Sequence, residues 1–197
     1  MSLFLFIFYW IVIPALVLLI ARSVMRRTKT PLHKGLVISI TVAVLLGFLW
    51  LAEGRKLYYD WQVRELCAKD GGVKVYETVR LPPDKFNEYG QINFYKPTQG
   101  ENTLGPEYIY KWDQFYYKKG EPAANGAQEI AMRRDHIKII RKHDMKLMGE
   151  VVMYSRGGGG LPGPWMPSGY HCPGALEANE VILMNRIFIK SFEGNNK

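Results

Sequence analysis

Cys67 and Cys172 are the residues of this chain whose chemistry is easiest to predict, because they are the only cysteines among its 197 residues. Disulfides form and persist in oxidising compartments, and the membrane topology that the charge pattern predicts places both residues outside the cytoplasm. We therefore expect a disulfide between them, with two buried free thiols as the alternative. A redox-active pair is not indicated, because the sequence has no Cys-x-x-Cys motif.

The four histidines indicate neither a metal site nor a catalytic site. His171 adjoins Cys172, and adjacent residues rarely converge on one metal ion or act together as nucleophile and base. His136 and His143 are seven residues apart, which would align them on a helix but not on the strand expected there. The serine, histidine and aspartate residues form no recognisable catalytic signature. We predict no metal, no cofactor and no small-molecule substrate.

Residues 157–174 contain seven glycines and four prolines, a composition that we expect to exclude regular structure. The glycine run lacks the Gly-Lys-Ser/Thr of a phosphate-binding loop. Large apolar side chains in such a segment either pack beneath it or contact a partner. Trp165, Met166 and Tyr170 are therefore candidate interaction residues, with packing beneath the loop as the alternative.

A run of basic residues between positions 133 and 146 is a second candidate interaction surface, because only two aspartates offset it. It could meet anionic lipid head groups or an acidic partner; a solvated strand face is the alternative. The candidate contacts are Arg133, Arg134, Lys138 and Lys142.

Two uncharged apolar runs, residues 3–21 and 35–52, precede all of these positions. A helix of about 19 residues spans roughly 28 Å, the thickness of a bilayer's hydrocarbon core. A cleavable signal peptide fits the first run poorly, because no basic residue precedes it and no small-x-small site follows it. We expect residues 1–52 to form a transmembrane hairpin in the lipid bilayer and residues 53–197 to form one extracytoplasmic domain.

The basic residues between the two runs predict the orientation of the hairpin. Residues 22–34 contain five Lys and Arg residues and no acid, and short loops rich in Lys and Arg stay in the cytoplasm. The domain would then lie outside the cytoplasm, which in a Gram-negative bacterium is the periplasm, on the outer side of the inner membrane. The chain carries a formal net charge of +8, of which the residues after position 52 contribute only +3. The net positive charge therefore arises partly from the basic loop that sets the membrane topology, and we predict no nucleic-acid binding.

The remaining residues alternate between helical and strand patterns. Residues 53–72 predict a helix with an apolar stripe that ends at Cys67. Strands are predicted at residues 73–79, 91–95, 108–112, 137–142 and 146–155, with residues 115–117 as a candidate extension of the same sheet and an exposed loop at 118–129. Residues 176–189 favour a helix that runs into a short strand, with a strand throughout as the alternative. The expected fold class is α+β, with two N-terminal transmembrane helices and a mostly antiparallel sheet.

Two stretches carry a resemblance to known proteins. Residues 66–82, LCAKDGGVKVYETVRLP, and residues 147–173, which include GEVVMYSRGGGGLPGPWMPSGYHCP, are similar to a group of proteobacterial membrane-anchored or lipoprotein-like proteins with a CAKDGG-x-KVYETV stretch. The resemblance covers much of the outer domain and not the anchor. It implies no activity, and no site residue is carried over from it.

These features predict a non-enzymatic membrane protein whose outer domain binds another envelope protein or an incoming protein. Its role would be that of an accessory subunit or of a protective, immunity-like factor. The alternative is a periplasmic enzyme acting on lipid or cell-wall material, which needs a pocket where His171 meets Asp144 or Glu150. A structural membrane subunit whose helices make the contacts is the third possibility.

Overall fold

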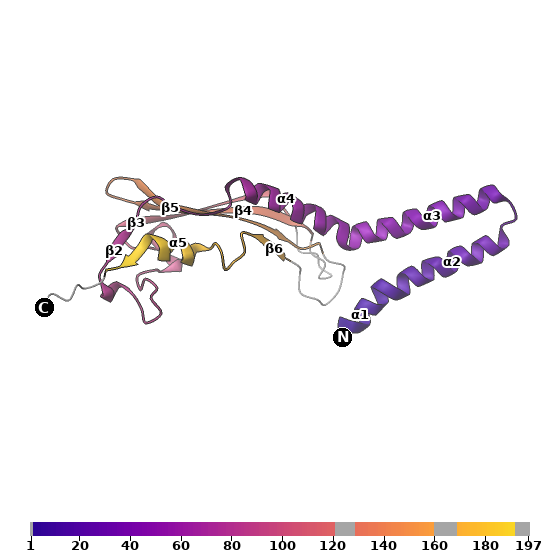
Figure 1. Ribbon diagram of the computed structural model, residues 1–197, viewed down its shortest axis with the longest axis horizontal. Helices are drawn as coiled ribbons and strands as arrows, with labels where there is room; N and C mark the ends of the chain where they lie inside the picture. Colours follow the sequence, from indigo (N-terminus) through magenta and orange to yellow (C-terminus); the bar gives the residue numbers. More distant parts are fainter. Residues whose placement is uncertain (1, 121–128, 160–168, 192–197) are drawn as a thin grey trace. The chain divides into compact units, whose positions relative to one another are not determined.

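The computed structural model describes residues 2–120, 129–159 and 169–191 (Figure 1). The chain divides into two compact units. The first comprises residues 1–59, 120–130 and 157–168, and the second comprises residues 60–119, 131–156 and 169–197. The described elements confirm the expected fold class, α+β with two long apolar N-terminal helices and a mostly antiparallel sheet.

Two helical stretches build most of the first unit. The first stretch consists of α1 (Ser2–Ile7), the π-helical turn η1 (Phe8–Val12) and α2 (Ile13–Arg27). The second consists of α3 (Pro31–Leu49), the π-helical turn η2 (Trp50–Gly54) and α4 (Arg55–Asp70), which continues into the second unit.

The predicted loop at residues 22–34 is much shorter in the structure, because only residues 28–30 separate the two helices. Arg26 and Arg27 occupy the last turn of α2, where basic side chains interact favourably with the helix dipole. Pro31 begins α3, and proline is favoured at the first helical position because the N–H it lacks would have no partner there. Both local effects extend the helices into the expected loop.

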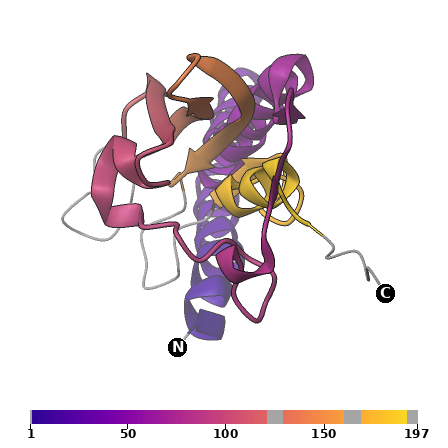
Figure 2. The ribbon, with the colours of Figure 1, turned by 90° about the vertical axis from the view of Figure 1, so that its left-hand side faces the viewer.

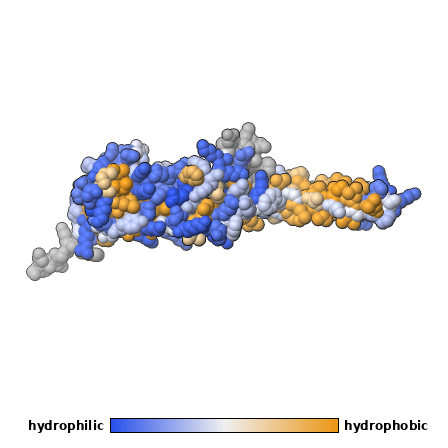
Figure 3. All heavy atoms as spheres, turned by 90° about the horizontal axis from the view of Figure 1, so that it is seen from above, coloured by the Kyte–Doolittle hydropathy of each residue, from blue (hydrophilic) through white to orange (hydrophobic). Residues whose placement is uncertain are grey.

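The paired N-terminal helices expose apolar side chains over most of their length. Side chains of α2 and α3 line a shared apolar groove of about 340 Å³, and the rings of Trp10 and Phe48 lie 6.1 Å apart. Leu19 is 62% exposed, and Figure 3 shows the hydrophobic surface that such residues form along these helices. Both stretches contain spans long and apolar enough to cross a membrane. An exposed apolar surface of this extent suits lipid better than water, so these two helical stretches are candidate membrane-spanning segments and suggest membrane anchoring.

Five strands form the main sheet of the second unit. The sheet has the order β1-β5-β4-β3, and β6 also pairs with β5. The strands are β1 (Gly72–Val75), β3 (Tyr108–Lys118), β4 (Ala131–Arg141), β5 (Lys146–Gly157) and β6 (Gly169–Cys172). β3 and β4 are antiparallel from Tyr108 opposite Arg141 to Lys118 opposite Met132, with a bulge after Tyr116. A separate two-stranded sheet pairs β2 (Val79–Leu81) with β7 (Phe188–Lys190) in parallel.

Helix α5 (Glu180–Ile187) covers one face of the main sheet, as Figures 1 and 2 show. Asn179 caps this helix by accepting a hydrogen bond from the Ile182 N–H at 2.8 Å. Ile187 on α5 is fully buried in one core with Ile139 of β4. Gly149 on β5 permits the close approach, because a Cβ there would lie 2.9 Å from both Ile187 Cδ1 and the Lys74 carbonyl oxygen.

Several predicted elements match these elements closely. The predicted helix at 53–72 corresponds to α4, and the predicted strands at 108–112 and 146–155 correspond to β3 and β5. β3 continues to Lys118 and so includes the candidate extension at residues 115–117. The favoured helix followed by a strand is confirmed in α5 and β7, although α5 begins only at Glu180. The short 3-10 helices η3 (Pro83–Lys85) and η4 (Pro97–Asn102) had no counterpart in the predictions.

Other predicted elements need correction. The strand predicted at 73–79 is split into β1 and β2, and β4 begins at Ala131, six residues before the predicted start. The strand predicted at 91–95 is wrong, because this stretch contributes a single bridge between Phe86 and Ile92. Residues 157–174 contain β6 despite their composition, because pairing with β5 stabilises it. Most of the predicted loop at 118–129 lies outside the described residues.

Candidate functional site

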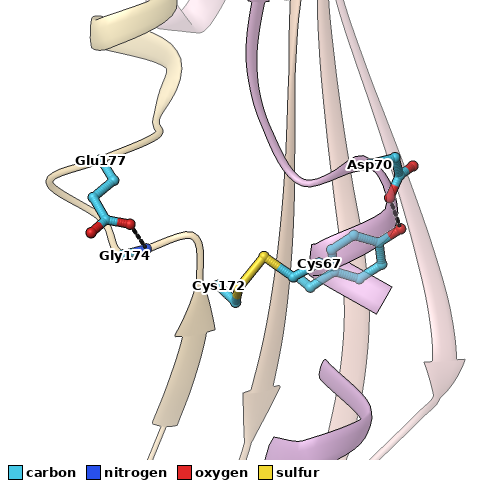
Figure 4. Close-up of a disulfide and its surroundings, with 6 residues drawn as sticks. Cys67, Asp70, Cys172, Gly174 and Glu177 are labelled. Carbon is cyan, nitrogen blue, oxygen red and sulfur yellow. Dashed lines mark hydrogen bonds between the residues drawn. A yellow bond between two sulfur atoms is a disulfide. The ribbon is translucent and has the colours of Figure 1, made fainter. Parts of the chain in front are cut away.

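The two cysteines form a disulfide, as expected from the sequence. Cys67 on α4 and Cys172 at the end of β6 have their Cα atoms 5.9 Å apart and are separated by 105 residues in the chain. Figure 4 shows this bond tying the helix to the segment that follows β6. The Cys67 side of the bond is buried, and the bond holds the end of β6 to α4, which is a structural role.

A network of hydrogen bonds begins at the end of α4 and crosses the face of the sheet opposite α5. Asp70 accepts a hydrogen bond from the Tyr154 hydroxyl at 2.7 Å and another from Arg134 at 2.9 Å. Arg134 also donates to the Tyr154 hydroxyl oxygen at 3.1 Å. Burial opposes ionisation of Asp70, but the hydrogen bonds from Tyr154 and Arg134 lower the pKa of its carboxyl.

The network continues through His136 and Glu150. His136 Nε2 lies 2.6 Å from one carboxylate oxygen of Glu150, and the Tyr76 hydroxyl donates to the other at 2.7 Å. Burial again opposes ionisation, but hydrogen bonds with Tyr76 and His136 lower the pKa of Glu150. Each carboxylate oxygen of Asp70 and Glu150 therefore has a partner, which is typical of a network that fixes the position of its members.

The residues that the enzyme alternative requires are engaged in other contacts. The carboxylate of Asp144 pairs with Arg141 at 2.7 Å, and that of Glu150 pairs with His136. His171 lies on β6. Among the described residues, no three His, Cys, Asp or Glu side chains are grouped so that they could hold a metal ion.

The four basic candidate residues do not form one basic surface. Arg133 and Arg134 are adjacent in β4, and successive side chains of a strand point to opposite faces. Arg133 pairs with Asp135 at 3.0 Å, whereas Arg134 pairs with Asp70. The acids that face them offset the positive charge of both faces.

The other two basic candidates have weaker contacts. Lys138 Nζ lies 3.8 Å from an Asp113 carboxylate oxygen, and Lys142 Nζ donates to the Asn102 side chain at 2.8 Å.

Of the three candidates in the glycine-rich segment, Tyr170 lies on β6 and is partly exposed. Trp165 and Met166 lie outside the described residues, so their role stays a prediction.

The outer edge of β3 is the surface that the sequence reasoning did not identify. β3 is the last strand of the sheet and pairs with β4 alone among the described strands. Its first residues, including Tyr108 and Tyr110, are buried, but every residue from Lys111 to Lys118 is exposed. The side of β3 that faces away from β4 pairs with no other described strand, and a sheet edge of this kind can pair with an extended segment of another chain.

Large aromatic side chains project from both faces of this edge. Trp112 is 58% exposed and Phe115 is 59% exposed, and the neighbouring Tyr116 and Tyr117 are also exposed. Contacts with the sheet hold the rings in place: Trp112 Nε1 donates to Asp135 at 3.2 Å, and the rings of Phe115 and Tyr117 meet edge to face at 5.0 Å. We refer to residues 111–118 as the aromatic edge.

The sequence contained one signal of the aromatic edge, the run of three aromatic residues from Phe115 to Tyr117. Its position at the end of the sheet depends on the order of the strands, which no local pattern reveals.

No protein-family model, curated protein or solved structure matches this chain. Its function therefore has to be inferred from these surfaces.

Proposed function

We propose that this chain is a membrane-anchored accessory protein of the bacterial inner membrane. Its periplasmic domain binds another envelope protein, or an incoming protein, through the aromatic edge, and it catalyses no reaction. Two features support the periplasmic location. The five basic residues of the anchor lie near its hairpin turn with no acid among residues 1–52, which favours a cytoplasmic turn, and a disulfide favours an oxidising compartment.

The observation that carries the proposal is the exposure of aromatic side chains on a strand with a free edge. An extended segment of a partner can add to such an edge through backbone hydrogen bonds. Tryptophan and tyrosine supply much of the binding energy of protein interfaces, because they bury a large area at a small cost in conformational entropy. The aromatic edge offers both kinds of contact within eight residues.

The identity of the bound protein decides between the two roles expected from the sequence. An accessory subunit would bind a resident protein of the envelope, whereas a protective, immunity-like factor would bind a protein that enters from outside. Both roles use the same surface. The resemblance of residues 66–82 and 147–173 to proteobacterial membrane-anchored proteins agrees with either role.

A site-specific crosslinking experiment tests the proposal. A photoreactive phenylalanine analogue replaces Phe115 in the full chain, expressed in bacterial membranes, and a second variant carries it at Tyr89. Tyr89 is the matched control, because it is an aromatic residue that is 80% exposed and lies outside the aromatic edge. We expect illumination to yield one discrete adduct from position 115 and none from position 89. The substitution Trp112→Ala should reduce the adduct at position 115 at least tenfold.

Three outcomes would contradict the proposal. Equal adducts from both positions would show that exposure alone explains the crosslinks, and no adduct from position 115 would show that the aromatic edge is not in contact with a partner. An adduct at twice the mass of the chain would show that the edge contacts a second copy instead of a different protein.

A further inference from the structure

The cytoplasmic end of α2 in the proposed topology carries a cluster of arginines on one side of the helix. Arg22, Arg26 and Arg27 line a concave surface of about 440 Å³ together with Ser23 and Leu19. The pairs 22/26 and 23/27 are spaced four residues apart, which places each pair on adjacent turns of the same face. All three arginines are exposed, and we refer to them with Ser23 as the arginine cluster.

The arginine cluster carries positive charge that no acid of the anchor offsets. Residues 1–52 contain no Asp or Glu, and the ion pairs found in the described part of the chain do not involve these arginines. Three guanidinium groups within six residues repel one another, so an anion that binds among them gains from all three. The guanidinium group matches a phosphate oxygen pair with two parallel hydrogen bonds.

The position of the cluster along the helix selects one source of phosphate. Arg22 lies about 7.5 Å below Arg27 along the helix axis, at 1.5 Å per residue, and a long arginine side chain can reach from that depth to the interface. Leu19, one turn deeper, is exposed beside the arginines. Figure 3 shows this change from a hydrophobic shaft to a hydrophilic surface at the hairpin turn. A phospholipid has the same sequence of groups, with an acyl chain below a phosphate, whereas free phosphate has nothing to contact Leu19.

We infer that the arginine cluster binds the phosphodiester group of an anionic phospholipid, whose acyl chain lies against Leu19. The inference rests on the proposed membrane-spanning anchor and is independent of the partner at the aromatic edge. A lipid held there would fix the depth of the hairpin turn in the cytoplasmic leaflet.

Native mass spectrometry of the full chain in detergent tests this site with phosphatidylglycerol as the probe and phosphatidylcholine as the neutral reference. The test variant is Arg22→Gln with Arg26→Gln. The control is Lys29→Gln with Lys34→Gln, which removes the same charge near the same hairpin turn but outside the concave surface. Each arginine removed would lose a charge-assisted hydrogen bond to the phosphate, which contributes about tenfold in affinity, so we expect at least tenfold weaker binding of phosphatidylglycerol in the test variant. The two lysines do not line the concave surface, so we expect less than threefold weaker binding in the control.

The possible results separate a defined site from diffuse attraction. Equal losses in the two variants, or no loss in the test variant, would overturn the inference, as would equal affinity of the unmodified chain for phosphatidylcholine. Displacement of the lipid by millimolar inorganic phosphate would reassign the cluster to free phosphate. Circular dichroism of both variants should give the helix content of the unmodified chain, which shows that a loss of lipid reports the site. A missing crosslink at Phe115 would leave these results unchanged, so the two proposals fail separately.

Discussion

Removal of the Cys67–Cys172 disulfide should destabilise the second unit more than any single change of side chain on its surface. The bond joins residues 105 positions apart. In the chain-entropy model, a crosslink stabilises the folded state by restricting the unfolded chain, and a loop of this length corresponds to about 4.8 kcal/mol at 25 °C. That is a large part of the 5–15 kcal/mol that is typical of the stability of a whole domain.

The measurement compares three forms of the full chain in detergent: oxidised, reduced, and the double variant Cys67→Ala with Cys172→Ala. Guanidinium unfolding, followed by near-ultraviolet circular dichroism, gives the free energy of unfolding of each. With a denaturant slope of about 4 kcal/mol per molar, the midpoint should fall by about 1.2 M on reduction. The reduced chain keeps both sulfur atoms, so it separates the effect of the bond from the loss of packing in the double variant.

A difference of less than about 1 kcal/mol between the oxidised and reduced chains would refute the reasoning. It would mean that the unfolded chain is already restricted or that the bond strains the folded domain enough to offset its entropic effect. A double variant much less stable than the reduced chain would show that packing around buried Cys67, and not the covalent bond, is the larger contribution.

Two further predictions concern the packing and the ionisation of the domain. Gly149→Ala should lower the free energy of unfolding by about 1–3 kcal/mol, because its Cβ would lie 2.9 Å from the Lys74 carbonyl oxygen and from Ile187 Cδ1 of α5. The control Gly157→Ala lies in the same strand, where an added Cβ would have no described atom within 4 Å, and it should change the free energy of unfolding by less than about 1 kcal/mol. Equal effects of the two variants in chemical denaturation would contradict this account. The carboxyls of Asp70 and Glu150 have pKa values below the ordinary 3.8 and 4.5, so the unfolded chain binds more protons than the folded one in mild acid. Their stabilisation should be complete above about pH 5.5 and decline as the pH falls through the lower folded values. Asp70→Asn with Glu150→Gln should flatten this decline in denaturation curves measured from pH 6 to pH 3, and an unchanged slope would show that the network does not control acid stability.

Local patterns were sufficient to predict the elements that contain a long or regular apolar pattern of their own. The two apolar runs predicted the helices of the anchor, and the apolar stripe of residues 53–72 predicted α4. β5 was predicted almost to its ends. In each of these segments the apolar pattern is long or regular enough to indicate the element without reference to distant residues.

The first half of β4 was missed because its polarity depends on contacts from distant residues. Arg134 is matched by Asp70, which is 64 residues away in sequence, and buried Asp135 accepts hydrogen bonds from Trp112 and Gln114 of β3. A run of charges at residues 133–136 therefore looks like a solvated segment when it is read alone.

The aromatic edge could not be predicted for a related reason. The same alternation of aromatic residues is buried at Tyr108 and Tyr110 and exposed beyond Lys111. The difference arises because the aromatic cluster of Tyr108 with Phe188 covers one end of β3 only. Phe188 follows α5 and is 80 residues away in the chain, so the composition of β3 contains no sign of where the cover ends.

The central claim is that the domain lies outside the cytoplasm, since both the disulfide and the proposed partner depend on it. The most direct measurement fuses two reporters in turn to Lys197 of the full chain in a bacterial host: alkaline phosphatase, which is active only outside the cytoplasm, and green fluorescent protein, which fluoresces only inside it. We predict an active phosphatase fusion and a dark fluorescent fusion. A fluorescent fusion with an inactive phosphatase would contradict the account.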